Sequence, residues 1–88
     1  MASKTVIVGS TVGLHARPAA LVAQAAAEFD DDITLRLSDA DADDAVDAGS
    51  SMMIMSLGAA AGDEIVVESD NAEAVEKLAA LIEQNLDA

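Results

Sequence analysis

Short segments rich in β-branched residues alternate along this 88-residue chain with segments of helical period. Clusters of Val, Ile and Thr, or their alternation with polar residues, are typical of strands. Four segments have this pattern: 4–8, 33–37, 45–48 and 64–68. The alternation would turn five side chains toward a core: Ile33, Leu35, Leu37, Ile65 and Val67.

The first helical segment begins around Pro18, which is tolerated in the first turn of a helix, and runs to about Glu28. Its polar stripe consists of Arg17, Gln24 and Glu28. The spacing of the remaining residues predicts that five are largely buried: Leu21, Val22, Ala25, Ala26 and Phe29.

Two more helical segments follow. The second is short, from Ser51 to Leu57, with Gly58 in position to end it. The third begins at Asp70, which forms a capping-box-like pair with Glu73. Its apolar positions recur at helical spacing: Val75, Leu78, Ala79, Ile82 and Leu86.

This order of elements predicts an α+β fold in one domain, residues 1–88, with helices covering one face of a sheet. Phe29 is the one aromatic residue, so the core must be filled by aliphatic side chains. The chain has no cysteine, no apolar run long enough to span a membrane and no pattern typical of a signal peptide. We therefore expect a cytoplasmic protein without membrane insertion, and a monomer.

Charge narrows the classes of partner. Seventeen acidic residues against four Lys and Arg give a net charge of −13, which disfavours nucleic acid and anionic lipid as partners. The chain is nevertheless 52% hydrophobic, so it is not a disordered acidic tail. An acidic, lysine-poor folded domain suggests adaptation to high salt, where screening would stabilise the fold.

Residues 13–20 read Gly-Leu-His-Ala-Arg-Pro-Ala-Ala and contain the chain's single histidine and single proline. The proline and the alanines that follow it place His15 at or just before a helix N-terminus. Free backbone N–H groups and the helix dipole make such a terminus a good site for an anion, and Arg17 adds a guanidinium suited to phosphate oxygens. A neutral imidazole is nucleophilic near pH 7. The residue types therefore suit a histidine that accepts a phosphoryl group, although an ordinary N-cap or surface role for His15 stays open.

Residues 13–20 resemble the active-site signature of HPr, the phosphocarrier protein of the phosphoenolpyruvate (PEP):sugar phosphotransferase system. Residues 50–58, Ser-Ser-Met-Met-Ile-Met-Ser-Leu-Gly, resemble the regulatory-serine helix of that family. The resemblance implies an open-faced β-sandwich in the order β-α-β-β-α-β-α, with a four-stranded antiparallel sheet under three helices. It also implies a carrier that does not itself turn over a substrate.

On this resemblance, Nδ1 of His15 accepts a phosphoryl group from the PEP-dependent Enzyme I and passes it to a sugar-specific Enzyme IIA. Arg17 and the backbone N–H groups of Ala16 and Arg17 would bind the phosphoryl group, and neither a metal nor a cofactor is expected. Partner enzymes would dock on Ala20, Gln24, Ser51, Met52 and Met55, with Met53 less favoured. Ser50 would be a regulatory site for an HPr kinase, although an N-cap role explains it equally well.

Two other functions stay open. One is a relay of the phosphoryl group to a dihydroxyacetone kinase or a regulatory branch. The other is an adaptor without relay activity that signals through Ser50 and the methionines. The presence of both His15 and Arg17 argues against the adaptor, which would need neither.

The chain departs from the family pattern in three places. Val12 stands where many members have Ser or Asn, so Thr11 or Ser10 would have to supply that polar contact. Gln24, Ala27 and Met53 stand where members often carry lysines, so attraction to acidic partners is not expected to drive docking. Gly49 replaces the basic neighbour of the regulatory serine.

Residues 38–44 are longer than the family pattern needs and suggest an insertion at a hairpin tip. Their Asp-x-Asp-x-Asp spacing invites comparison with a calcium-binding loop. Asp44 and Ser50 occupy the positions where that loop requires Gly and Glu, so a solvated acidic tip is favoured.

Overall fold

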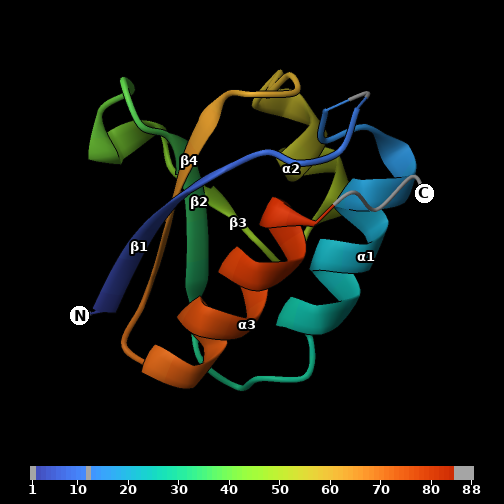
Figure 1. Cartoon of the computed structure of the whole chain (residues 1–88). Coiled ribbons are helices and arrows are strands. Elements are labelled where there is room, and N and C mark those ends of the chain that lie inside the picture. The colour runs from blue at the N-terminus through green and yellow to red at the C-terminus, as the bar shows by residue number, and fades with distance from the viewer. Residues whose placement is uncertain (1, 12, 85–88) are drawn as a thin grey trace.

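The computed structural model describes residues 2–11 and 13–84, and its elements are arranged as a sheet with helices packed against it (Figure 1). In chain order the elements are β1 (Ala2–Ile7), α1 (Ala16–Ala26), β2 (Ile33–Leu37), the 3₁₀ helix η1 (Ala42–Asp44), β3 (Val46–Asp47), α2 (Ser51–Ser56), β4 (Glu64–Ser69) and α3 (Ala72–Glu83).

The four strands form one sheet in the order β1-β4-β2-β3, and each neighbouring pair is antiparallel. β4 lies between β1 and β2, and its register with β1 runs from Ala2 opposite Ser69 to Ile7 opposite Glu64. The α+β class that the sequence pattern predicted is confirmed, and so is the four-stranded antiparallel sheet with three α-helices that the resemblance implied.

The core lies between the sheet and the helices and is aliphatic. From the sheet, Ile33, Leu35, Ile65 and Val67 are buried, while Leu37 at the end of β2 is only half-buried. The helices add Val22, Ile54, Val75, Leu78 and Ile82. Phe29 packs at the margin, because it follows the end of α1.

Two expectations for the first helix are wrong. α1 ends at Ala26, with Ala27 as its C-cap, and does not reach Glu28. Leu21 is 37% exposed, although the pattern predicted it to be buried. It follows Arg17 by four residues and precedes Gln24 by three, so all three side chains lie on the outward-facing stripe of the helix.

The start of α3 also differs from the prediction. The N-cap is Asn71 instead of Asp70, and its side-chain oxygen accepts hydrogen bonds from the backbone N–H groups of Glu73 and Ala74 at 3.0 and 3.3 Å. Its side-chain nitrogen donates to Asp31 at 2.9 Å, which joins this cap to the turn after α1. The predicted buried residues Val75, Leu78, Ala79 and Ile82 are confirmed, and Leu86 lies outside the described residues.

We predict that Asn71→Ala lowers the free energy of unfolding by about 1 kcal/mol, because two N–H groups of α3 lose their acceptor. The matched variant Asp70→Ala should change it by less than about 0.5 kcal/mol, since the exposed Asp70 caps nothing. Urea unfolding followed by far-ultraviolet circular dichroism measures both. Equal losses in the two variants would contradict this assignment of the cap.

Candidate functional site

His15 is the N-cap of α1. Its backbone is extended (φ −80°, ψ −169°), and its carbonyl accepts the first helical hydrogen bond from Ala19 at 2.8 Å. The imidazole is exposed and makes no capping hydrogen bond. The side chain is therefore not used to hold the helix together and is open to reaction.

Two backbone donors lie next to this imidazole. Ala16 and Arg17 are the first residues of α1, so their N–H groups have no acceptor within the helix itself. Pro18, the third residue, has no N–H, and the N–H of Ala19 already bonds to His15. The helix start thus offers two adjacent N–H groups and the positive end of its dipole to an anion.

Backbone contacts hold the segment that carries His15. Gly13 has a φ of +78°, and a Cβ at this position would lie 2.4 Å from the carbonyl oxygen of Ala59. The next residue, Leu14, donates its N–H to that same oxygen at 3.0 Å and buries its side chain in the core. Only glycine allows the chain to pass this close to Ala59 and turn into the helix.

The same segment is fixed at its other end by α3. The N–H of Gly9 donates to the carbonyl of Ile82 at 3.0 Å, and a Cβ on Gly9 would lie 1.9 Å from the carbonyl oxygen of Glu83. Accordingly, the start of α1 and the end of α3 lie at the same end of the molecule (Figure 1). Contacts far apart in sequence therefore position His15 from both sides.

A depression of about 200 Å³ adjoins the imidazole. It is lined by Leu14, His15, Met55, Gly58, Ala59 and Ala60. The residues come from the start of α1 and from the end of α2 with the loop that follows it. This brings together the two segments, 13–20 and 50–58, that the sequence singled out.

Arg17 differs from the other cations of the chain. Lys4 pairs with Glu76 at 3.0 Å, Lys77 with Glu28 at 2.7 Å, and Arg36 with Glu68 at 3.5 Å. The hydrogen bond and charge of Glu76 raise the pKa of Lys4 above its ordinary value. Arg17 is exposed and has no carboxylate partner among the described residues. In a chain with seventeen acidic residues, its guanidinium is thus left available to a ligand.

The predicted contact residues lie on α1 and α2. Gln24 is exposed and Ala20 and Ser51 are half-buried. Met52 and Met55 are 76% and 39% exposed, and Met53, which was less favoured, is 46% exposed.

Ser50 is the N-cap of α2. Its side-chain oxygen accepts a hydrogen bond from the N–H of Met53 at 3.3 Å. Ser50 therefore has the N-cap role that was expected as the alternative to a regulatory site.

Of the two residues expected to replace the family's Ser or Asn, Ser10 is fully buried and Thr11 is exposed. Val12 lies outside the described residues.

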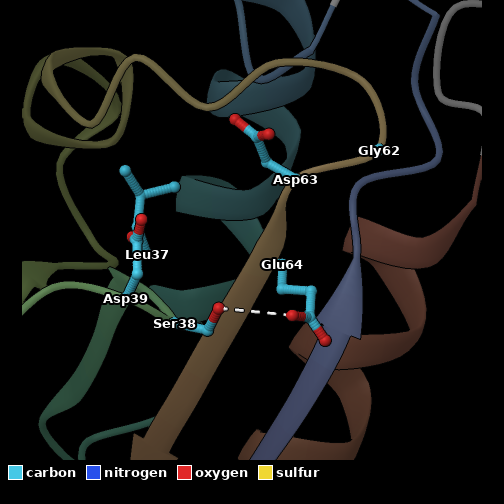
Figure 2. Close-up of a pocket in the computed structure, with 6 residues that line it drawn as sticks. All are labelled: Leu37, Ser38, Asp39, Gly62, Asp63 and Glu64. Carbon is cyan, nitrogen blue, oxygen red and sulfur yellow. Dashed lines mark hydrogen bonds between the residues drawn. The ribbon is translucent and has the colours of Figure 1, made fainter.

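A second and larger hollow, of about 350 Å³, was not anticipated from the sequence (Figure 2). It is lined by Leu37, Ser38, Asp39, Gly62, Asp63 and Glu64. Ser38 donates to Glu64 at 3.5 Å, and Asp63 accepts the N–H of Ala60 at 2.9 Å. Three carboxylates and no cation line this hollow, so it is unsuited to a phosphoryl group, and it shares no residue with the depression at His15.

Comparison with known proteins identifies the family. The PTS-HPr family, described as "PTS HPr component phosphorylation site", matches residues 2–84. The chain belongs to the HPr family. It is a phosphocarrier of the phosphotransferase system, as the resemblance implied.

Individual relatives agree over nearly the whole chain. The phosphocarrier protein HPr of Streptomyces coelicolor is 40% identical over 90 residues, covering 99% of this chain and 94% of the relative. Among solved structures, HPr from Bacillus anthracis superimposes with a TM-score of 0.81 at 38% identity, covering 92% of this chain and 95% of that one. HPr-C-His from Thermoanaerobacter tengcongensis gives a TM-score of 0.85 at 34% identity, covering 100% and 98%.

No helix within residues 2–11 and 13–84 is both long enough and apolar enough to cross a membrane.

We predict that Gly13→Ala is clearly more destabilising than Gly58→Ala. Both glycines have positive φ, so alanine at either costs about 1 kcal/mol in backbone conformation. A Cβ at Gly58 meets nothing within 4 Å, whereas at Gly13 it collides with Ala59, which should cost at least about 1 kcal/mol more. Urea unfolding of both variants measures the difference, and equal losses would show that the contact with Ala59 does not restrain the segment before His15.

Proposed function

We propose that Nδ1 of His15 accepts the phosphoryl group from a phosphohistidine of Enzyme I and hands it to a histidine or cysteine of a sugar-specific Enzyme IIA. The observation that supports this most is the exposed imidazole of His15 without a capping role, beside two N–H groups and a guanidinium that have no partner among the described residues.

The transfer from Enzyme I to His15 exchanges one P–N bond for another. The lone pair on Nδ1 of His15 attacks phosphorus, and the bond between phosphorus and the donor imidazole breaks with its electron pair leaving on the donor nitrogen. A proton leaves Nε2 of His15 and one is taken up by the donor, so the charge balances. Because such a transition state is loose, in-line placement and stabilisation of the equatorial oxygens matter most.

The start of α1 supplies both requirements. The N–H groups of Ala16 and Arg17 are fixed in direction by the helix, so they need no reorganisation when the phosphoryl group arrives. The Arg17 guanidinium adds a charge that can bind two oxygens at once. These groups bind the phosphoryl group without hydrolysing it, which suits a carrier whose partners perform each turnover.

The destination of the phosphoryl group is proposed to be sugar uptake. A dihydroxyacetone kinase or a regulatory branch would use the same site on this chain and would differ only in the acceptor. Phosphorylation of Ser50 by an HPr kinase is a separate proposal. It would add negative charge to the N-terminus of α2, where the helix dipole favours it, at the oxygen that now accepts the N–H of Met53.

We predict that incubation with PEP and Enzyme I from the same source organism, in molar salt, adds one acid-labile phosphoryl group to the wild type and none to His15→Ala. Arg17→Ala should slow the transfer by about tenfold or more, because charge on the transferring group loses its stabilisation. Lys77→Ala is the matched control, because it removes a cation of α3 that does not belong to the site. Its transfer rate should stay within about twofold of the wild type. Mass spectrometry before and after mild acid measures the adduct.

Two outcomes would overturn the proposal. One is an adduct that persists in His15→Ala. The other is the absence of an adduct on folded wild-type protein while Enzyme I is shown to phosphorylate itself.

A further inference from the structure

Methionine supplies all the sulfur of this chain. The sequence has no cysteine and four methionines, three of which belong to α2: Met52, Met53 and Met55. Their side chains are exposed by 76%, 46% and 39%, respectively. The fourth, Met1, lies outside the described residues. Oxidation of sulfur in this protein therefore takes place at a methionine, and three thioethers of α2 are open to it.

The three thioethers of α2 differ in their surroundings. Met55 lines the depression beside His15, whereas Met52 and Met53 do not line it. Apart from the imidazole, the side chains that line this depression are apolar. An oxygen atom added to the sulfur of Met55 would thus be a new polar group next to the reactive histidine.

Backbone contacts hold Met55 at this place. The preceding residue, Ile54, is fully buried and anchors α2 in the core. In the loop after α2, the carbonyl of Ala59 accepts the N–H of Leu14 at 3.0 Å, which joins this loop to the segment before His15. The thioether and the imidazole therefore stay on the border of one depression through contacts that use neither side chain.

The depression has room for a small oxidant. Its volume of about 200 Å³ is several times the roughly 30 Å³ that one water molecule occupies in the liquid. A hydroperoxide such as hydrogen peroxide can therefore reach the sulfur of Met55 from the side of His15.

We propose that Met55 is a redox-sensitive modification site, and that its oxidation to the sulfoxide by a hydroperoxide slows phosphoryl acceptance at His15. The inference rests on the proposed function for the role of His15. It adds a modification at a residue whose sulfur takes no part in the transfer of the phosphoryl group.

The oxidation is a two-electron step. A lone pair on the sulfur attacks the terminal oxygen of the hydroperoxide, the O–O bond breaks, and the proton of the attacked oxygen passes to the leaving oxygen. The products are the sulfoxide and an alcohol, or water when the oxidant is hydrogen peroxide. A methionine sulfoxide reductase reverses the step, with the oxygen leaving as water while a dithiol is oxidised to a disulfide.

The added oxygen opposes phosphorylation in two ways. The S–O bond is strongly dipolar, and the partial negative charge on its oxygen repels an approaching phosphoryl group. The same oxygen accepts hydrogen bonds, so it competes with the phosphoryl oxygens for the N–H groups of Ala16 and Arg17 at the start of α1. Both effects disappear when the sulfoxide is reduced.

The test compares two double variants that each keep one methionine of α2. Met52→Leu with Met53→Leu keeps Met55, and Met52→Leu with Met55→Leu keeps Met53, which is similarly exposed but does not line the depression. Leucine preserves the volume and the apolar character of the side chain. Each protein is treated with hydrogen peroxide, peptide mass spectrometry counts the sulfoxides at every methionine, and circular dichroism monitors the fold.

The rate of His15 phosphorylation is measured with phosphoramidate, a small phosphoryl donor that needs no partner enzyme. We expect oxidation of the variant that keeps Met55 to slow this reaction about three- to tenfold and to shift the imidazole proton signals of His15 in the NMR spectrum. Oxidation of the variant that keeps Met53 should leave the rate within about twofold and the signals in place. Methionine sulfoxide reductase with dithiothreitol should restore the rate.

Three results would overturn the inference. The first is equal slowing of the two oxidised variants, which would mean a general effect of oxidation on α2. The second is an unchanged rate in the variant that carries a confirmed sulfoxide at Met55. The third is a thioether at Met55 that resists peroxide while that of Met53 reacts.

The same proteins, before oxidation, are also incubated with PEP and Enzyme I. If Enzyme I does not phosphorylate them but the sulfoxide of Met55 slows the reaction with phosphoramidate, the proposed function fails and this inference stands. If Enzyme I phosphorylates them and the sulfoxide has no effect on the reaction with phosphoramidate, the inference alone fails.

Discussion

The hydrogen bond from the N–H of Leu14 to the carbonyl of Ala59 joins the two halves of the site, and the position of His15 depends on it. Leu14 is anchored in the core, so its backbone cannot move away from Ala59 without exposing that side chain. Gly13 allows the close approach, and His15, the residue after Leu14, is the N-cap of the helix. The loop after α2 thereby fixes where α1 begins and which donors face solvent there.

The cationic residues of the chain lie in two kinds of place. Three of its four Lys and Arg residues pair with carboxylates on surfaces away from the site, and the fourth, Arg17, lies beside His15. A phosphoryl group carries negative charge, and a net charge of −13 would disfavour it if the acidic residues were spread evenly. Neither α1 nor α2 carries an acidic residue, and the carboxylate of Asp63, near the site, accepts the N–H of Ala60. Acidity of the whole protein and affinity of one site for an anion are thus compatible.

The sequence predicted the fold class, the strand order along the chain and the helical N-terminus at His15, because each depends on local patterns of β-branched, apolar and capping residues. The predictions from sequence were wrong where contacts between distant segments determine the position of a residue. Leu21 is apolar but faces outward, since α1 buries the positions on either side of the Arg17–Gln24 stripe. The N-cap of α3 is Asn71 and not Asp70, and its side chain also donates to Asp31, forty residues away in sequence.

The most direct test of the central claim is the amide NMR spectrum of the chain before and after phosphorylation by Enzyme I and PEP. If the start of α1 binds the phosphoryl group on His15, the amide protons of Ala16 and Arg17 should shift downfield as they donate to its oxygens. The amides of Glu73 and Ala74 at the start of α3 already bond to Asn71 and should stay in place. Phosphorylation of His15 that leaves Ala16 and Arg17 unmoved, or that shifts the α3 amides instead, would contradict this account.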